Sequence, residues 1–532
     1  THFITTPETE GTSYTYNGNT RPYAVKGIWD QYNNKDLNKD LLISFGYGDG
    51  GGGPNRDMIE TIPCVNKIPG IPHVKTETAT SYFRHLHEVV DKNEMGGYLP
   101  VWDGELYLEF HRGTYTSQAF NKMMNRRMEY YLRDAEMLST IALQLNGTPY
   151  DKGQLAEIWK IILCHQFHDI LPGSAIHEVY EDSHTEYGKA AAMLAKIMTE
   201  VNKGLFKEQK DCYTVWNDAN WKRDSFITIP QAEEGDSFAD EKGTALDSAV
   251  QGGRTVVFLK DMEPFSFVTV HRVKASGKDG ARVLDSNEAS TMYYRVAWNE
   301  NGQLTSIYDK EAGRELLPEG KCGNVLQILE DKPRCFDAWE LEPTYDEKLE
   351  IINDCDNIKA EENALGIFVT FTWKYHKSEL KQTMCLYREK KRIDFKTEVD
   401  WQERQKLMKV AFPVNIRAVD ARFDIQYGNM RRTITRNNSW EAARFEVCAH
   451  KWADLSETGY GLALLNDCKY GYDVKEDTIR LSLLKSAVDP DYAADLGHHE
   501  FTYSILPHTD EWYRSGIEKE AFDLNNPLMA VS

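Results

Sequence analysis

A carboxylate set among glycines is the first feature of this sequence that could do chemistry. Asp49 stands in the segment GYGDGGGGP at residues 46–54, directly after the apolar run at residues 41–45. Glycines let a substrate approach the backbone closely, and functional groups of α/β folds lie at the carboxyl ends of strands. The segment lacks the Gly-Lys-Ser/Thr ending of a phosphate-binding loop. Asp49 is therefore a candidate catalytic residue, with a turn-capping aspartate as the alternative.

Two imidazoles near a carboxylate form the second candidate, in the segment CHQFHD at residues 164–169. His165 and His168 are three residues apart, and His165 and Asp169 are four apart, so on a helix they would share one face. Imidazole binds zinc, and a neighbouring carboxylate can orient a ligand or hold a substrate. Histidines at helix ends also bond carbonyl groups or complement the helix dipole. The spacing leaves a metal site and a helix cap both open.

The third candidate is the segment WDGELYLEFHRGTYTS at residues 102–117, which combines carboxylates, aromatic rings, His111 and Arg112. Such a loop suits sugar binding, because rings can stack on a sugar and charged groups can bond its hydroxyls. An ordinary helix entry with Ser117 near the N-cap explains the same residues. Residue type and spacing do not decide between these readings.

The elements that must position these candidates follow from hydrophobic periodicity. The apolar run at 41–45 predicts a buried strand of a parallel α/β sheet, and residues 56–62 a short helix. Apolar residues at steps of three or four then predict three helices within residues 117–204, joined by short connections as in an antiparallel bundle. These stripes are Phe120, Met124, Met128, Tyr131, Ala135, Leu138, Ala142 and Leu145; Leu155, Ile158, Trp159, Ile162 and Leu163; and Ile176, Val179, Tyr180, Tyr187, Leu194, Ile197 and Val201.

From about residue 211 the period changes to two. Strands are predicted at residues 254–259, 266–273, 367–375 and 392–401, and many strands in succession indicate β-sandwich domains. The predicted fold class is multidomain α/β + α + β. Its domains are the C-terminal part of an α/β catalytic domain at residues 1–85, a helical bundle at 86–205 and a β-sandwich region at 206–532.

Composition and charge exclude several classes of protein. A formal net charge of −21 would repel a polyanion, so no nucleic-acid partner is expected. The densest basic cluster, REKKR at residues 388–392, is expected to lie at a solvated strand edge. The sequence has no apolar run of the roughly 18 residues that a membrane-spanning helix needs, so no membrane partner is expected. Nine scattered cysteines without a Cys-x-x-Cys pair favour reduced thiols and a cytoplasmic protein.

Six segments in order resemble glycoside hydrolase family 38, the α-mannosidases, and are most similar to its bacterial cytoplasmic branch. The resemblance covers essentially the whole chain, and six ordered segments are far more specific than any one of them. The segments are GYGDGGGGP at 46–54, LPVWDGELYLEFHRGTYTSQ at 99–118, QFHDILPGS at 166–174, NVLQILEDKP at 324–333, LALLNDCKYGYDV at 462–474 and HTDEWYRSG at 508–516.

The resemblance implies a zinc-dependent retaining mechanism, in which one carboxylate attacks the anomeric carbon and a second acts as acid and then as base. By that resemblance His168 is a zinc ligand, and Asp169 is a carboxylate that holds substrate hydroxyls. Asp49 corresponds to the general acid/base, and His111 or Arg112 to a side chain that contacts the sugar.

The resemblance also implies that the chain is truncated at both ends. Family members carry a His-x-Asp zinc pair and the nucleophilic aspartate upstream of these motifs, and this chain contains no such segment. We expect a retaining α-mannosidase that acts on a glycan or oligosaccharide with terminal α-mannose, with its zinc site and nucleophile completed from outside this chain. The alternative is a non-catalytic carbohydrate-binding or assembly fragment, and a homo-oligomeric state is left open. An unrelated zinc hydrolase is disfavoured because the sequence has no His-Glu-x-x-His motif.

Overall fold

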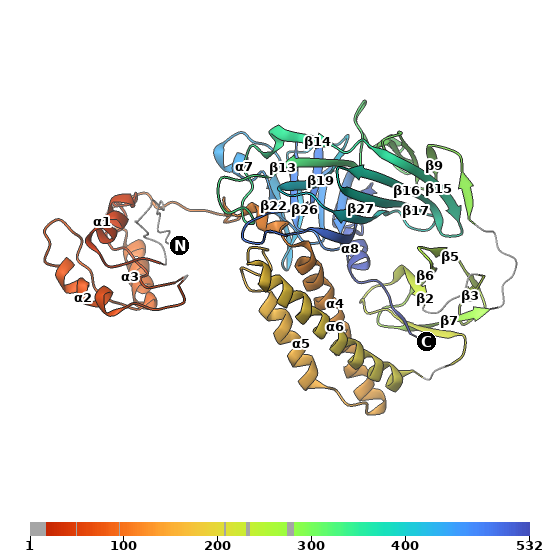
Figure 1. Cartoon of the computed structure of the whole chain (residues 1–532), viewed down its shortest axis with the longest axis horizontal. Helices are drawn as coiled ribbons and strands as arrows, with labels where there is room; N and C mark the ends of the chain where they lie inside the picture. The colour runs from red at the N-terminus through yellow and green to blue at the C-terminus, as the bar shows by residue number, and fades with distance from the viewer. Residues whose placement is uncertain are drawn as a thin grey trace. The chain divides into compact units, whose positions relative to one another are not determined.

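A computed structural model describes residues 17–48, 50–94, 96–206, 209–229, 235–273 and 281–531. The chain forms two compact units, residues 1–106 and residues 107–532. The second unit contains a helical bundle and every β-sheet formed by the described residues (Figure 1). The domain boundary predicted at residue 85 falls within helix α3 (Ala79–Lys92), and the division between the units lies at residue 106 instead.

The first unit is built mainly from α1 (Pro22–Gln31), α2 (Arg56–Val65) and α3. Side-chain caps start two of these helices, because Asn55 accepts a hydrogen bond from the Met58 N–H and Thr78 one from the Ser81 N–H. The buried strand predicted at residues 41–45 is wrong for the described residues. This run is only partly buried and makes a single parallel bridge, between Gly18 and Phe45. One bridge cannot pair a strand on both sides, so an apolar run alone does not make it a central strand.

The helical bundle confirms the three predicted apolar stripes. Its helices are α4 (Ala119–Asn146), α5 (Lys152–His165) and α6 (His177–Leu205), and Gly147, with φ 78°, ends α4. Their shared core contains Met128, Leu132, Ala135, Leu138, Ala142, Leu155, Ile158, Ile162, Tyr187, Ala190, Leu194, Ile197 and Val201. Three predicted members of the stripes are instead more than half exposed, because they lie at helix ends where the stripe leaves the core. They are Leu145, Leu163 and Ile176.

Two small sheets follow the bundle and enclose a common core that includes Val215, Ile227, Val257 and Val270. The five-stranded sheet has the order β28 (Ala530–Val531), β1 (Cys212–Trp216), β7 (Phe267–Val273), β3 (Ser237–Ala239) and β4 (Ala245–Leu246). The three-stranded sheet has the order β2 (Arg223–Ile229), β6 (Arg254–Met262) and β5 (Ser248–Gln251). The last strand of the chain thus pairs with the first strand after the bundle.

Three further sheets share the main hydrophobic core. The four-stranded sheet has the order β12 (Arg314–Glu315), β11 (Leu304–Asp309), β10 (Tyr294–Trp298) and β9 (Glu288–Ser290). The six-stranded sheet has the order β14 (Leu349–Ile351), β13 (Val325–Glu330), β19 (Lys406–Pro413), β26 (Thr478–Lys485), β25 (Gly471–Lys475) and β22 (Val447–Cys448). The ten-stranded sheet has the order β21 (Gly428–Thr433), β20 (Asp420–Ile425), β23 (Trp452–Glu457), β24 (Tyr460–Asn466), β27 (Gly497–His508), β18 (Ile393–Trp401), β17 (Ser378–Tyr387), β16 (Gly366–Tyr375), β15 (Cys355–Asn363) and β8 (Arg282–Leu284).

Each of the four predicted strands is present, as β6, β7, β16 and β18, and the fold class is confirmed as helices and antiparallel sheets in the predicted order. Their register keeps apolar residues together; Ile505 of β27, for example, faces Ile393 of β18 on one side and Leu464 of β24 on the other. Four short elements complete the second unit. They are η1 (Arg112–Tyr115), η2 (Tyr345–Lys348), α7 (Ser439–Ala443) and α8 (Ile517–Asn525).

The basic cluster at residues 388–392 does not lie at a solvated edge as predicted. Lys390 and Arg392 are buried, and both bond carboxylates of α8. The Lys390 ammonium lies 2.7 Å from Asp523 Oδ2, and Arg223 lies 2.8 Å from Asp523 Oδ1. Burial raises the pKa of Asp523, but Lys390, Arg223 and Arg392 lower it by more, so that the carboxyl is ionised throughout the neutral range. Charges separated by 128 to 300 residues in sequence therefore join α8 to the sheets.

Replacing the buried carboxylate should destabilise the second unit strongly. Asp523→Ala leaves Lys390, Arg223 and Arg392 without their shared carboxylate, at an expected cost of about 3–5 kcal/mol in free energy of unfolding. Glu311→Ala is the matched control, because it removes the partner of the half-exposed Lys391 and should cost less than about 1 kcal/mol. Urea unfolding of both variants measures the difference; equal losses would contradict the assigned role of Asp523.

Candidate functional site

The candidate acid/base Asp49 lies outside the described residues, and its role stays a prediction. The residues around it form a tight reversal of the chain, with a bridge between Tyr47 and Gly52 and a 2.8 Å hydrogen bond from the Gly52 N–H to the Tyr47 carbonyl. Gly51 has φ 68°, a conformation that glycine adopts without steric cost. Gly51 and Gly52 thus allow the chain to reverse direction here.

The predicted zinc ligand His168 and its neighbour Asp169 lie on the surface of the second unit, in the turn that follows α5. Their side chains are 79% and 47% exposed, and His168 Nε2 lies 3.5 Å from Asp169 Oδ2. The ring of Phe167 packs against the His168 imidazole, with 4.2 Å between the ring centroids. An imidazole and a carboxylate are thus presented together to solvent, as donors to a metal or to a substrate.

The expected shared face of His165 and His168 is wrong, because α5 ends at His165 and the chain then turns. His165 points into the bundle, where Nε2 lies 2.9 Å from Glu186 Oε2 of α6 and the ring packs on Tyr187. Burial lowers the pKa of His165 below its ordinary value, although Glu186 opposes this shift. His165 is therefore a packing residue of the bundle, and it takes no part in the candidate site.

A buried lysine ties the turn after α5 to the segment before α4. The Lys122 ammonium donates hydrogen bonds to the carbonyl oxygens of Ser117, Leu171 and Pro172, the latter two at 2.9 and 3.3 Å. Gly173 packs directly on Ser117, because a Cβ at residue 173 would lie 2.4 Å from the Ser117 oxygen. Two of the segments that the sequence singles out, 99–118 and 166–174, are therefore adjacent in the fold.

His111 and Arg112 have different surroundings. Arg112 is buried and lies over the ring of Phe445. It donates hydrogen bonds to the carbonyl oxygens of Ala443 and Glu109, and so holds the segment around residue 112 in place. The His111 side chain is 34% exposed, with Nδ1 2.6 Å from Glu340 Oε1. Of the two predicted sugar contacts, only His111 is open to solvent, and we carry it forward in that role.

Three aromatic rings surround His111, and two of them, Phe110 and Phe336, are exposed. Phe110, Phe336 and Trp339 lie within 6.4 Å of the imidazole, measured between ring centroids. Because a carboxylate oxygen only accepts hydrogen bonds, His111 Nδ1 donates to Glu340, which leaves Nε2 as the ring nitrogen that faces away from this carboxylate. Glu340 also accepts the backbone N–H of His111 at 3.1 Å, which holds this residue at φ 59°.

Two aspartates that the sequence analysis did not single out fix the start of α4. Asp495 accepts the backbone N–H groups of Gln118 and Ala119 at 2.9 and 2.7 Å. Asp491 accepts from the Gln118 side chain at 2.7 Å and lies 2.8 Å from His177 Nδ1, and this hydrogen bond raises the pKa of His177. Their partners are more than 300 residues away in sequence, so local spacing contains no signal for them.

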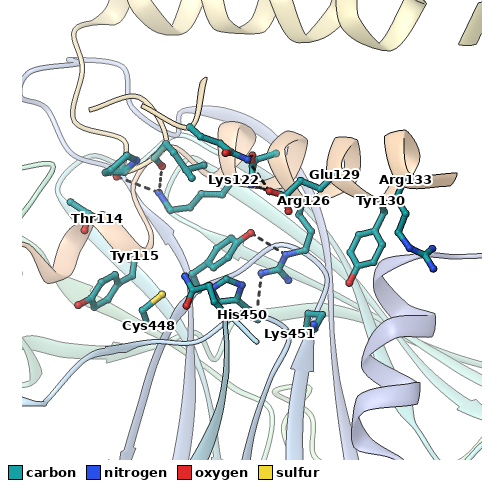
Figure 2. Close-up of a pocket in the computed structure, with 16 residues that line it drawn as sticks. Thr114, Tyr115, Lys122, Arg126, Glu129, Tyr130, Arg133, Cys448, His450 and Lys451 are labelled. Atoms are coloured by element: carbon teal, nitrogen blue, oxygen red, sulfur yellow. Dashed lines mark hydrogen bonds between the residues drawn. The ribbon is translucent and has the colours of Figure 1, made fainter. Parts of the chain in front are cut away.

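A cavity of about 660 Å³ lies within the second unit, between α4 and the sheets (Figure 2). Three of the singled-out segments, 99–118, 166–174 and 462–474, contribute to its wall. The lining residues are Thr114, Tyr115, Lys122, Asn125, Arg126, Glu129, Tyr130, Arg133, Gln166, Leu171, Pro172, Gln426, Cys448, His450, Lys451 and Tyr470.

Models of three domains of one known family match the chain in order. A model of the glycosyl hydrolases family 38 N-terminal domain matches residues 1–105, one of the α-mannosidase middle domain matches residues 109–205, and one of the family 38 C-terminal domain matches residues 289–493. The chain belongs to glycosyl hydrolase family 38. The three matches follow the order expected from the sequence, and the middle-domain match ends where α6 ends.

Two relatives of the chain are named alpha-mannosidases. The chain is 33% identical over 508 residues to human alpha-mannosidase 2C1, covering 94% of the chain and 47% of that protein. It is 32% identical to alpha-mannosidase G of Dictyostelium discoideum, covering 94% of the chain and 49% of the relative. The chain thus spans about half the length of these two relatives.

A solved structure confirms the fold. The crystal structure of an alpha-mannosidase from Enterococcus faecalis V583 superimposes with a TM-score of 0.75 and 16% sequence identity, covering 96% of this chain and 68% of that chain. Among the described residues, no helix combines the length and the apolar character needed to cross a membrane.

The close packing of Gly173 on Ser117 gives a direct test of the junction between two family motifs. Gly173→Ala places a Cβ against the Ser117 carbonyl at φ 92°, and should cost about 3 kcal/mol of stability or more. Gly188→Ala is the control, because the space around Gly188 is open and alanine favours the α6 helix. Thermal unfolding should show a lower Tm only for Gly173→Ala; an unchanged Tm would contradict this packing.

Proposed function

We propose that the protein containing this chain is a zinc-dependent retaining α-mannosidase that hydrolyses terminal α-mannosides of glycans. The observation that carries the proposal is the ordered match of three family 38 models along one chain. The named relatives are themselves alpha-mannosidases. His168, Asp169 and His111 are each open to solvent on the second unit, where a sugar could reach them.

The two side chains of the turn fit a zinc ion as donors. His168 supplies an exposed imidazole, and Asp169 supplies a carboxylate 3.5 Å from it. Within the described ranges no group of three or more His, Cys, Asp or Glu side chains is arranged to hold a metal. The proposed site therefore takes its other ligands from outside the described residues. When bound, zinc would polarise sugar hydroxyls and stabilise charge at the reacting centre.

The chain's own residues would bind and orient the sugar and move a proton. Asp169 would accept hydrogen bonds from sugar hydroxyls, and His111 would bond one through Nε2 while Nδ1 donates to Glu340. Asp49 would protonate the departing oxygen and then accept a proton from the attacking water, as retaining glycosidases require of their acid/base. Burial of Arg112 fixes the backbone that carries His111.

Removing the imidazole of His168 tests the zinc assignment. His168→Ala should lower the bound zinc and reduce hydrolysis of an aryl α-mannoside at least about a hundredfold, because a side chain that binds the metal directly is lost. Chelation of the unmodified protein should abolish activity, and added zinc should restore it. Zinc content is measured by atomic absorption on the same samples.

His498→Ala is the matched control for this substitution. His498 is also exposed and lies 3.1 Å from a carboxylate, that of Glu500, on the surface of β27. It should keep both zinc and activity. Wild-type zinc content and activity in His168→Ala would remove His168 from the site, and full activity after chelation would remove zinc from the proposal.

Replacement of Asp49 tests the acid/base role. Asp49→Ala should slow hydrolysis of a substrate with a poor leaving group by about 10²–10⁴-fold. A dinitrophenyl leaving group needs no protonation, so its release should be spared, and azide should restore turnover by replacing the water that Asp49 activates. Asp91→Ala, on the exposed face of α3, is the control. Wild-type rates with both substrates would contradict the assignment.

A second candidate, sugar binding without turnover, is favoured by the exposed rings around His111. It predicts saturable binding of methyl α-mannoside by a chain that hydrolyses none.

We also propose a cytoplasmic location, because all nine cysteines are free thiols dispersed along the chain.

A further inference from the structure

Helix α4 has a second inward face, made of charged and phenolic side chains, that no part of the proposed reaction uses. Lys122, Arg126, Tyr130 and Arg133 follow one another at helical spacing and point from α4 toward the sheets, into the cavity below the helix (Figure 2). The opposite face carries the apolar stripe that packs on α5 and α6. The cavity is thus formed where a cationic helix face meets a β-sheet region.

Arg126 is buried there without an ion-pair partner. Its guanidinium donates four hydrogen bonds to uncharged acceptors, and no carboxylate of the described residues lies within 4.0 Å of it. One of its five N–H groups is left without an acceptor in that part of the chain. The acceptors are Tyr470 Oη, Asn466 Oδ1, Asn525 Oδ1 and the His450 carbonyl. A buried charge is costly unless a partner compensates it.

Lys122 is a second buried cation on the same wall. Its three donors are all directed to main-chain carbonyls, and among described side chains it too has no carboxylate within ion-pair distance. Burial lowers the pKa of Lys122 to about 7, although the nearby Asp495 opposes this shift. With a pKa of about 7, Lys122 can lose its proton near neutral pH.

The other charges of the lining do not offset these two. Arg133 is already paired with Asp218, and Lys451 Nζ lies 3.4 Å from Asp424 Oδ2. Burial lowers the pKa of His450 to about 4, so its ring is neutral at neutral pH. Glu129 is the only carboxylate on the wall, and burial raises its pKa. The lining therefore has an excess of positive charge.

The wall also has an excess of donors over acceptors. Tyr470 accepts from Arg126, but its own hydroxyl proton has no acceptor among the residues that the structure describes. The hydroxyls of Tyr115 and Tyr130 likewise have no hydrogen-bond partner within the described chain. A group with several acceptor oxygens and no donors of its own would complement the free donors of Arg126 and Tyr470.

We propose that this cavity binds a phosphate group, either free or carried by a small metabolite, with the oxyanion at Arg126 and Tyr470. The volume, about 660 Å³, lies in the range of small-molecule sites and exceeds what a bare anion fills. Leu171 and Pro172 supply apolar wall for an organic body. The bound anion would compensate Arg126, and its field would favour the protonated form of Lys122.

Calorimetric titration of the full chain tests the proposal without any measurement of activity. Glucose 6-phosphate and inorganic phosphate are the probes, and glucose is the control for the sugar. We expect saturable binding of at least one phosphate and none of glucose. Tighter binding of glucose 6-phosphate would identify an organic phosphate as the occupant, and equal or tighter binding of inorganic phosphate would identify the free anion.

Two variants change the charge of the wall in opposite directions. Glu129→Gln removes its carboxylate and should tighten phosphate binding by about threefold or more, whereas Lys451→Gln should weaken it by a similar factor. Lys321→Gln is the matched control, because Lys321 is a partly exposed lysine paired with Asp477 and lies outside the cavity. It should leave the affinity unchanged.

Two results would overturn the proposal. One is the absence of saturable binding of either phosphate up to roughly 10 mM, where even a weak site is detectable. The other is equal affinity in Glu129→Gln, Lys451→Gln and Lys321→Gln, which would place the bound phosphate elsewhere on the molecule. Because one variant is expected to bind more tightly, misfolding cannot produce the predicted pattern.

Discussion

One buried ammonium group sets the geometry of the surface that carries the candidate site. Lys122 donates hydrogen bonds to the carbonyl oxygens of Ser117, Leu171 and Pro172. Ser117 lies just before α4, and the other two lie in the turn after α5. Buried carbonyls are costly when they lack donors, so the two segments are stable together only in the arrangement that satisfies all three. This arrangement turns His168 and Asp169 outward and places His165 in the bundle.

The same constraint explains why α4 has two inward faces. Its apolar stripe packs against α5 and α6, and its charged face lies against the sheets, with Arg126 bonded to residues of β24, α8 and the loop before β23. A helix that is covered on two sides needs hydrogen-bond partners for the charged side chains on its covered faces. In α4 these partners are main-chain carbonyls and side-chain amides. The cavity lies beside these hydrogen-bonded groups, between α4 and the sheets.

Periodicity was sufficient to predict the three bundle helices, the β-rich second half and four particular strands, because each depends on residues close in sequence. The prediction for 41–45 was wrong because an apolar run becomes a central strand only when neighbours pair with it. The basic cluster at 388–392 was misplaced because its partners on α8 lie some 130 residues further along the chain. At the candidate site, the motifs singled out His168, Asp169 and His111, whose roles stay predictions. Glu340, which holds His111, is 229 residues away and has no local signal.

The central claim is that the turn after α5 presents His168 as a ligand of zinc. X-ray diffraction at the zinc absorption edge, from crystals of the zinc-loaded protein, tests it most directly. We predict an anomalous peak about 2.1 Å from a ring nitrogen of His168, the usual zinc–imidazole distance. A zinc peak elsewhere, with the His168 imidazole free in solvent, would contradict the account.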